Sequence, residues 1–227
     1  FQNTCTGDGG GIYFVEGRPI LKNCLLTGKT AFIGGGGIAS HWEAAPTITN
    51  CTIVANEASD PNDSTRGYGG GLFCSYESQA ILINSILWDN SGRYGDQIAI
   101  GSKDDDTYLQ RPAGVTVKFC DIQGGETGVH VESGRTLNWL VGNLSSDPLF
   151  VAPYFLSQIA AGQSQTSPAV DAGDALASQA GLDAYTTRSD AVTDAGQVDM
   201  GYHYVGEGQY RLTVNIIGGH GTVQPLS

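Results

Sequence analysis

The chain has few charged residues, fewer basic ones and no long apolar segment. Of its 227 residues 15 % are charged, and 11 lysines and arginines stand against 23 aspartates and glutamates, which gives a net charge of -12. Nucleic acids and anionic membranes attract basic surfaces, so this charge argues against binding to either. A membrane-spanning helix needs about 18 consecutive apolar residues, and the sequence contains no such run.

Cysteine patterns typical of metal sites are also missing. The 5 cysteines form no Cys-x-x-Cys motif and have no histidine at zinc-binding spacing, and their odd number argues against a complete set of disulfides. Glycine, by contrast, is abundant at 33 residues, and a hydrophobic content of 40 % is sufficient for a core. This composition predicts many turns and short strands, in one large domain or two small ones.

Four segments of the chain align with one another without a gap. They read RPILKNCLLTGKTA from residue 18, APTITNCTIVANEA from 45, QAILINSILWDNSG from 79 and GVTVKFCDIQGGET from 114. Two apolar columns of this alignment contain Leu21, Ile48, Leu82 and Val117, and Leu26, Ile53, Leu87 and Ile122. A shorter block precedes each segment, as GGGIYF, GGGIAS, GGGLFC and the degenerate DQIAI, with its own apolar column at Ile12, Ile38, Leu72 and Ile98.

A repeat whose period lengthens by whole loops while its strands stay in register is typical of a solenoid. Apolar residues at helical spacing are missing from these units, which are rich in glycine, asparagine, threonine and β-branched residues. We therefore predict coils of three β-strands each, stacked so that successive coils pair in parallel about 4.8 Å apart.

An asparagine stands between the last two strands of the first three repeats, and Phe119 replaces it in the fourth. The apolar alternation slips by one residue here, as it would at a bend whose residue leaves the β region. Asparagine tolerates the left-handed conformation better than other non-glycine residues. We predict that the corners are Asn23, Asn50 and Asn84, and that their side chains form a hydrogen-bonded ladder along the stack.

The column after the corner contains Cys24, Cys51 and Cys120, with Ser85 in the third repeat. Adjacent coils bring the Cα atoms of Cys24 and Cys51 to about 4.8 Å, which a disulfide allows. In-register side chains on parallel strands often have the wrong dihedral for that bond, which favours free thiols as small apolar fillers. Both alternatives stay open at this point.

These motifs resemble a known family. A GGGI strand entry followed by P-x-I-x-N-C-x-I-x-x-N-x-A resembles the bacterial right-handed parallel β-helix repeat proteins of cell surfaces. It is similar to the GGAI and FxxN motifs of polymorphic outer-membrane proteins, with IVAN at 53–56 and LWDN at 87–90 as second motif and LTGK at 26–29 as a departure. The resemblance implies an all-β, right-handed parallel β-helix with a short C-terminal β extension, located outside the cell or on its surface.

Later motifs divide the chain into three parts. DPLF, SPAVDAGD and DMGYHY resemble the segment that closes such β-helices at the C-terminal end. We therefore expect coils at 1–145, a closing C-terminal segment at 146–206, and a β-strand tail or truncated second domain at 207–227. Because this family includes adhesins, surface-layer components and lyases, the resemblance does not single out one function.

Both ends of the sequence look unfinished. The first residues, Phe1 to Asn3, align with Val54 to Asn56, so the sequence begins partway round a coil. A tail strand that completes the first coil of the next copy would build a head-to-tail filament by strand addition. Flanking domains of a longer chain are the other explanation. The assembly residues of the filament hypothesis are Phe1, Asn3, Tyr210, Leu212, Val214 and Ile216.

Catalytic patterns of polysaccharide-degrading β-helices are not found in the repeats. Polygalacturonase-like members carry Asn-Thr-Asp, Asp-Asp, Gly-His-Gly and Arg-Ile-Lys, but here the Gly-His-Gly around His220 lies in the tail, and neither Asn-Thr-Asp nor Arg-Ile-Lys occurs. Polysaccharide lyases of this type use an arginine or lysine as the base, and the basic residues in or beside these repeats do not align in one column. We expect no catalytic residue. Calcium is an option at Asp104, Asp105 and Asp106, and with equal odds at Asp60 and Asp63, although such acids are more often solvated loops.

One predicted surface suits a sugar. The register places Trp42 above Tyr76 and Glu43 above Glu77, just beyond the GGGI strands. An aromatic face packs against the apolar face of a sugar ring, and carboxylates accept hydrogen bonds from its hydroxyls. Cross-coil stacking that stabilises a turn is the alternative. Our main hypothesis is a non-enzymatic structural protein that self-associates or belongs to a longer surface protein, with a carbohydrate-binding adhesin and a polysaccharide lyase or hydrolase as rivals.

Overall fold

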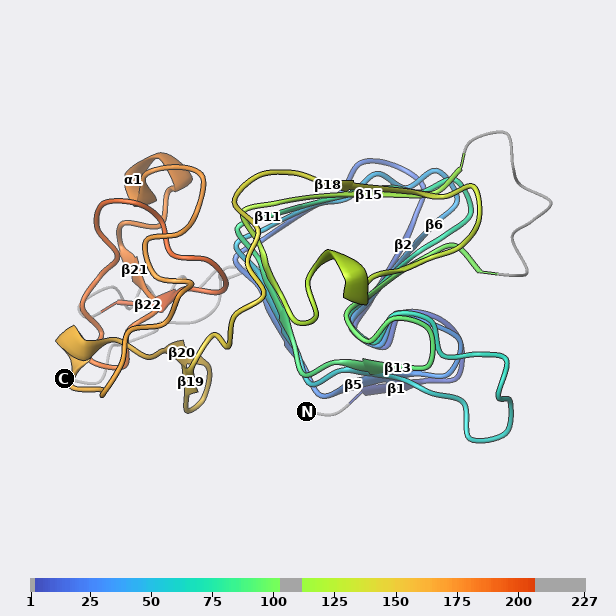
Figure 1. Cartoon of the computed structure of the whole chain (residues 1–227), viewed down its shortest axis with the longest axis horizontal. Helices are drawn as coiled ribbons and strands as arrows, with labels where there is room; N and C mark the ends of the chain where they lie inside the picture. Colours follow the sequence, from blue (N-terminus) through green and yellow to red (C-terminus); the bar gives the residue numbers. More distant parts are fainter. Residues whose placement is uncertain (1–2, 103–111, 207–227) are drawn as a thin grey trace, which may run out of the picture.

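Four parallel β-sheets run along a stack of coils, and each sheet receives one strand from successive coils (Figure 1). The structure is a computed structural model and describes residues 3–102 and 112–206. The first sheet contains β1 (Asn3–Cys5), β5 (Lys29–Ala31), β9 (Glu57–Ala58) and β13 (Ser91–Gly92). The second contains β2 (Ile12–Val15), β6 (Ile38–His41), β10 (Leu72–Cys74), β14 (Ile98–Ile100) and β17 (His130–Val131).

The other two sheets complete the coils. The third contains β3 (Ile20–Lys22), β7 (Thr47–Thr49), β11 (Gln79–Ile83), β15 (Gly114–Lys118) and β18 (Thr136–Trp139). The fourth contains β4 (Leu25–Thr27), β8 (Thr52–Val54), β12 (Ile86–Trp88) and β16 (Asp121–Ile122). The fold is thus the all-β, right-handed parallel β-helix that we predicted. The first three coils have four strands rather than three, because short strands of the first sheet follow each fourth-sheet strand.

The apolar columns read from the sequence are confirmed residue by residue. Ile48 pairs with Leu21 on one side and Leu82 on the other, and Leu82 pairs with Val117. Ile53 lies between Leu26 and Leu87 in the same way. These side chains form the main core cluster inside the coils. Strands β17 and β18 add a fifth, partial coil that the repeat alignment did not show.

Glycines shape the turn that enters the second sheet. Gly35 has a φ of 66°, in the left-handed region that side chains other than that of glycine rarely adopt. At Gly36 a Cβ would lie 2.4 Å from the Glu57 carbonyl oxygen and 2.5 Å from that of Gly70. The GGG block therefore serves a sharp turn and then a close approach of neighbouring backbones.

The predicted corners are confirmed as bends. Asn23, Asn50 and Asn84 have φ values of 50°, 49° and 49°, and Phe119 follows with 50°. One residue in the left-handed region reverses the side-chain alternation, so that Ile48 and Cys51 are both fully buried although they are three positions apart.

The C-terminal segment (146–206) lies beside the coils rather than across their end (Figure 1). We expected it to close the end of the solenoid. It packs instead against the outside of the fourth sheet, where Ile86 of β12 joins Leu156, Ala169 and Met200 in a second core cluster. Its elements are β19 (Phe150–Val151), β20 (Phe155–Leu156), the 3-10 helix η3 (Ile159–Ala161), α1 (Ala177–Ala180), β21 (Tyr185–Thr186) and β22 (Tyr204–Val205).

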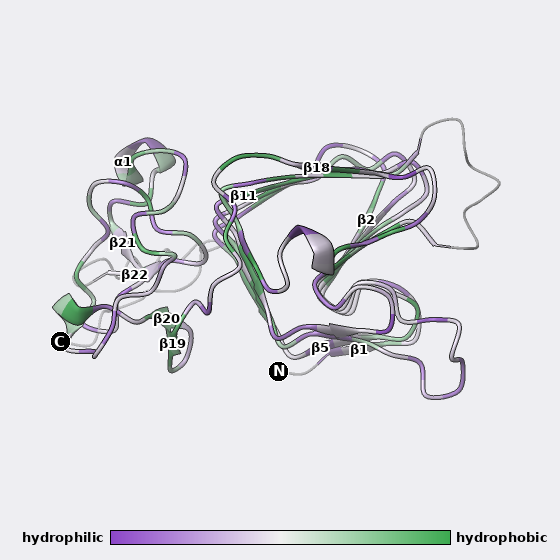
Figure 2. Ribbon diagram, viewed as in Figure 1, coloured by the Kyte–Doolittle hydropathy of each residue, from purple (hydrophilic) through white to green (hydrophobic). Residues whose placement is uncertain are grey.

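Among the described residues, two segments interrupt the regular coils. The 3-10 helix η2 (Glu126–Gly128) follows β16 and is exposed, and a hydrophilic loop after β9 projects away from the stack (Figure 2). Helices within the described ranges are all too short to cross a membrane. The long, straight faces of the coils are therefore the main surfaces on which a site can be built.

Candidate functional site

Three stacked turns connect the second sheet to the third, and they carry the surface that the sequence singled out. In successive coils these turns contain Glu16 and Gly17, then Trp42 and Glu43, then Tyr76 and Glu77, and all six residues have positive φ. The register of β2 with β6 leads to Glu16 beside Trp42, and the Glu43 N–H donates to the Tyr76 carbonyl at 3.2 Å. The turns therefore stack directly on one another, with Trp42 over Tyr76 and Glu43 over Glu77.

Aromatic rings fill one side of these turns. The rings of Trp42 and Tyr76 are stacked with centroids 4.5 Å apart and planes 11° from parallel. His41 lies behind them, fully surrounded, with its ring edge-on to Tyr13, Phe73 and Tyr76 at 4.9 to 5.3 Å. The stacking that we considered as an alternative to sugar binding is thus present, while Trp42 retains 37 % exposure at the surface.

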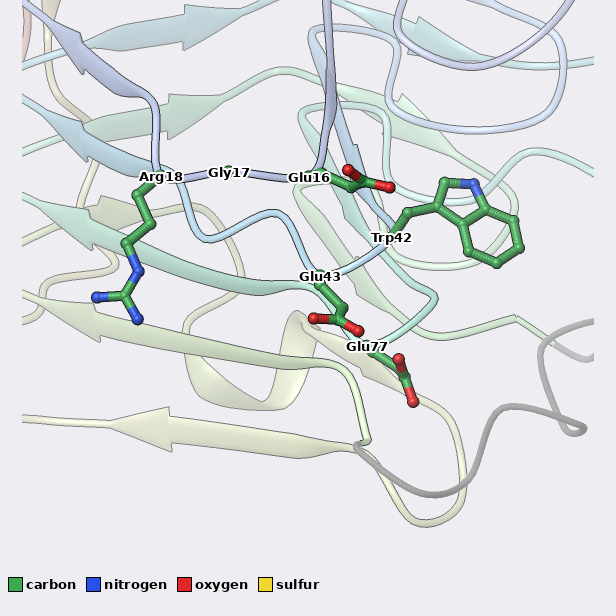
Figure 3. Close-up of a pocket in the computed structure, with 6 residues that line it drawn as sticks. All are labelled: Glu16, Gly17, Arg18, Trp42, Glu43 and Glu77. Atoms are coloured by element: carbon green, nitrogen blue, oxygen red, sulfur yellow. The ribbon is translucent and has the colours of Figure 1, made fainter.

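Carboxylates line a groove beside the Trp42 ring, as Figure 3 shows. A pocket of about 630 Å³ is lined by Glu16, Gly17, Arg18, Trp42, Glu43 and Glu77. A second pocket of about 610 Å³ shares Arg18, Glu43 and Glu77 with the first and continues to Gln79, Pro112 and Thr136. Together they form one open groove that extends from the first coil to the fifth, which we call the acidic groove.

The charge of the acidic groove restricts what it can bind. Three glutamates and one arginine line the first pocket, and like charges on adjacent coils lie close together because neighbouring strands are only about 4.8 Å apart. Such a surface repels polyanions and attracts hydroxyl-rich or cationic groups. Acidic polysaccharides, which lyases of this fold type would degrade, are therefore poor ligands for it.

The four sequence-predicted ligand residues are brought together as expected: Trp42, Glu43, Tyr76 and Glu77 lie on adjacent turns. Sequence reasoning missed Glu16 and Arg18. The repeat alignment could have identified Glu16, because it places this residue beside Trp42. It was overlooked because the two aligned residues differ in chemistry, one being an acid and the other an aromatic residue. The geometry of the turn, rather than the chemistry of its residues, is what the repeat preserves.

The corner asparagines differ from the ladder that we expected. The Asn23 side chain bonds to both main-chain polar groups of His203, and Asn50 Nδ2 donates to the Asp199 carbonyl at 3.3 Å. Asn84 Nδ2 donates to Asp174 Oδ1 at 2.8 Å. Their side chains point outward at a bend, so they form hydrogen bonds with the C-terminal segment and not with the next coil.

A buried amide ladder does exist, but one strand later, at Asn56 and Asn90 of the second and third repeats. Asn90 Oδ1 accepts hydrogen bonds from the backbone N–H and from Nδ2 of Asn56, at 3.0 and 2.9 Å. Asn56 Oδ1 in turn accepts the Lys29 N–H at 3.0 Å in the first coil. Asn90 Nδ2 donates to Gln97 Oε1 at 2.7 Å. These asparagines end the IVAN and LWDN motifs, and they satisfy backbone groups that the turn into the first sheet leaves unpaired.

The cysteine column is stacked as predicted, and its thiols are free. Cys51 and Cys120 are fully buried, whereas Cys24 is half-buried. Between them, Ser85 Oγ accepts the Cys51 N–H at 3.1 Å, and Cys120 Sγ accepts the Ser85 N–H at 3.4 Å. Burial raises the pKa of the Cys120 thiol to about 12, so this thiol is neutral at physiological pH.

A cluster of acids in the C-terminal segment was not foreseen. Ligand oxygens of Asp171, Asp194 and Asp199 lie within 4.8 Å of one another, which is the spacing of a cation site. Their carboxylates already accept protein hydrogen bonds: Asp199 from the Asp171 N–H at 2.7 Å and from Thr187, and Asp194 from the Asp199 N–H at 3.1 Å. Burial and the neighbouring Asp194 raise the pKa of Asp199 to about 6. The cluster is held together by these bonds.

Other predicted positions give a simpler picture. Asp60 and Asp63, the two acids of the other candidate calcium loop, both form ion pairs with Arg66, at 3.0 and 3.1 Å. Asn3 lies in β1, at the edge of the first sheet. The remaining residues lie outside the described part of the chain: Phe1, Asp104, Asp105, Asp106, Tyr210, Leu212, Val214, Ile216 and His220.

Comparison with known proteins agrees with the architecture. A family model described as right handed beta helix region matches residues 1–146, which is more than half of the chain. The match ends where the C-terminal segment begins. No curated protein and no solved structure matches the chain.

Proposed function

Because the chain belongs to the right-handed β-helix family over residues 1–146, we propose that it is a non-enzymatic structural protein of the cell surface, a rigid rod stiffened along its side. The observation that carries the proposal is the way in which the C-terminal segment bonds to the first four coils in turn. The surface location rests on the resemblance of the repeats to polymorphic outer-membrane proteins.

The C-terminal segment acts as a clamp along the coils. It bonds to Asn23 in the first coil and to Asn50 in the second, and in the third coil Asn84 and Asp174 exchange two hydrogen bonds. In the fourth coil Lys118 forms an ion pair with the same Asp174 at 2.8 Å. One continuous segment therefore ties together coils that otherwise contact only their neighbours.

Force spectroscopy along the coil axis tests the mechanical role. We expect the wild-type chain to resist extension in one cooperative event, because coils cannot separate before the clamp detaches. A variant with Asn23→Gly and Asn84→Gly keeps both corner conformations but loses the side-chain bonds, so it should extend at lower force and in several steps. Equal force profiles for the two proteins would contradict the proposal.

Digests of acidic and neutral polysaccharides, with and without calcium, should give no new reducing or unsaturated ends.

A carbohydrate-binding role is the second function that a specific observation favours. The acidic groove combines an exposed indole at Trp42 with the carboxylates of Glu16, Glu43 and Glu77, repeated at the spacing of the coils. Sugars present an apolar face to an aromatic ring and hydroxyls to carboxylates. The charge of the groove selects neutral or amino sugars over uronic acids, so the rod would carry an adhesive face.

A glycan array separates this role from a purely structural one. We expect neutral or amino-sugar oligomers to bind the wild-type chain, and Trp42→Ala and the pair Glu43→Gln with Glu77→Gln to lose at least ten-fold in affinity. Glu57→Gln, an exposed acid on the first sheet, is the matched control and should bind normally. Binding of uronic-acid polymers alone, or unchanged binding in the groove variants, would contradict the adhesive role.

Self-association is the third element of the proposal. Within the described residues, β2 and β3 pair with a strand on one side only, and an edge strand is a template for addition of another chain. Sizing of the purified chain with and without residues 207–227 tests whether the tail is the donor. Oligomers that disappear on deletion are expected, and a monomer in both cases would refute tail donation.

A further inference from the structure

Cys24 and Cys51 directly follow the corner asparagines of the first two coils. They are flanked by the in-register pairs Lys22 with Thr49 and Leu25 with Thr52, so the two residues lie directly above one another. The Cys51 sulfur lies 3.3 Å from the Thr49 carbonyl oxygen of its own coil and 3.7 Å from the Leu21 carbonyl oxygen of the first coil, so it is in reach of both coils. The two thiols are close enough for each to change the pKa of the other.

The interaction between the two thiols makes Cys24 the more acidic of the pair. The neighbouring Cys51 thiol lowers the pKa of Cys24 to about 7, and Cys24 together with burial raises the pKa of Cys51. A thiol with a pKa near the ambient pH is the best attacking group in thiol–disulfide exchange. Cys24 is also the more exposed of the two.

The other cysteines of the described chain have different neighbours. Ser85 takes the third place in the column, so Cys120 lies next to a hydroxyl and is fully buried. The Cys74 sulfur lies 3.3 Å from the Ser78 and Gly114 carbonyl oxygens. Cys5 stacks over Ala31 in the first sheet. The pairing in the column is therefore specific to the first two coils.

We propose that Cys24 and Cys51 form a reversible disulfide that staples the first coil to the second when the protein meets a low-molecular-weight disulfide such as oxidised glutathione. The Cys24 thiolate attacks one sulfur of this reagent and displaces the other as a thiol, which leaves a mixed disulfide on Cys24. Cys51 then loses its proton, attacks the Cys24 sulfur and displaces the second thiol. The two cysteines lose two electrons and two protons, and the reagent is reduced to two thiols.

The order of attack follows from the environment. The neighbouring Cys24 is the largest cause of the raised pKa of Cys51, and the Cys24 thiolate is consumed in the first step. Burial still opposes ionisation of Cys51, so the second step is the slower one. A transient mixed disulfide on Cys24 should therefore be detectable before the staple closes.

The test uses the whole 227-residue chain, incubated with oxidised glutathione, quenched with acid and alkylated after unfolding. We expect the alkylated thiols to fall from 5 by two, with a loss of two hydrogens in mass, and peptide mapping to join Cys24 to Cys51. Cys51→Ser should instead accumulate one glutathione adduct on Cys24. Serine is tolerated in this column, as Ser85 shows, and circular dichroism checks the fold of each variant.

Cys120→Ser is the matched control, because it removes a thiol from the same column without touching the pair. It should form the staple at the wild-type rate. The proposal is overturned if all thiols of the wild-type chain remain alkylatable, if mapping joins a different pair, or if Cys51→Ser acquires no adduct on Cys24.

Discussion

Asn23 and His203 are 180 residues apart in the sequence, yet the side chain of the first forms hydrogen bonds with both main-chain polar groups of the second. The His203 N–H donates to Asn23 Oδ1 at 2.7 Å, and Asn23 Nδ2 donates to the His203 carbonyl at 2.9 Å. This reciprocal pair joins the end of the C-terminal segment to the first coil. It explains why an asparagine stands at a corner where conformation alone would allow glycine.

Replacement of Asn23 should separate these two roles. Glycine adopts the left-handed φ of 50° without strain, so Asn23→Gly loses only the two hydrogen bonds, and we expect the free energy of unfolding to fall by about 1–3 kcal/mol. Asn23→Ala adds the cost of a left-handed alanine, about 1 kcal/mol more. Urea denaturation of both variants measures the difference. Equal stability of Asn23→Gly and the wild type would show that the pair contributes nothing.

The buried amide ladder gives the second prediction. Asn90 is 5 % exposed, and its side chain forms hydrogen bonds with the Asn56 side chain, the Ile53 carbonyl and the Gln97 side chain. Asn90→Leu leaves these partners buried and unpaired, so we expect a loss of at least about 3 kcal/mol. Thermal unfolding followed by circular dichroism measures it. Asn62→Ala, at an exposed loop position, should leave the midpoint unchanged.

The coils were predictable because their information is local and repeated. Leu21, Ile48 and Leu82 show the same spacing in each repeat, and a one-residue slip marks each corner. The hydrogen-bond partner of a corner side chain could not be predicted in this way, because no residue near Asn23 in the sequence indicates that it bonds to His203. The ladder was placed on the wrong asparagines for the same reason: sequence showed two asparagine columns, but only the backbone path shows which of them points inward.

The groove was predicted in part. Trp42 and Tyr76 stood out because aromatic residues aligned with each other and were followed by acids. Glu16 and Arg18 were not identified, since their turn aligns by conformation and contains a glycine where the next turns have glutamate. The acid cluster at Asp171, Asp194 and Asp199 joins three motifs spread over the C-terminal segment, and no spacing rule brings them together.

Stability should depend on pH through Asp121. This residue is fully buried, one carboxylate oxygen accepts the Ser146 N–H at 3.1 Å, and the other has no hydrogen-bond partner among the described residues. Burial raises the pKa of Asp121 to about 7. When folding raises the pKa of an acid, its contribution to stability is fully present below the unfolded pKa, near 3.9. This contribution falls as the pH rises and is lost above the folded pKa, here about 7.

We therefore expect the free energy of unfolding to fall between pH 4 and pH 8, with about 4 kcal/mol of the fall attributable to Asp121. Burial also raises the pKa values of Asp8 and Asp199 to about 6, so they add to the fall in the same direction. Asp121→Asn should reduce the difference between the two pH values, whatever its absolute stability. Asp183→Asn, at an exposed position, is the control, and an equal pH dependence in both variants would refute this assignment.

The acidic groove should reduce the stability of the fold. The Glu43 N–H donates to the Tyr76 carbonyl at 3.2 Å, so the turns are in register and Glu43 lies over Glu77. Like charges on directly adjacent strands destabilise a sheet by a few tenths of a kcal/mol, and salt screens them. Glu77→Gln should therefore raise the unfolding midpoint slightly at low ionic strength and lose that advantage near 1 M salt.

Glu57→Gln distinguishes this repulsion from a general effect of net charge. Glu57 is exposed and pairs with Thr30 and Ser91, which are uncharged. Its replacement should leave the midpoint unchanged at both salt concentrations, because it removes the same charge without relieving a close contact. If Glu77→Gln behaves in the same way, the column carries no repulsion. If it stabilises the fold at low salt, the chain maintains a row of acids at a measurable cost, as expected of a surface that serves binding rather than folding.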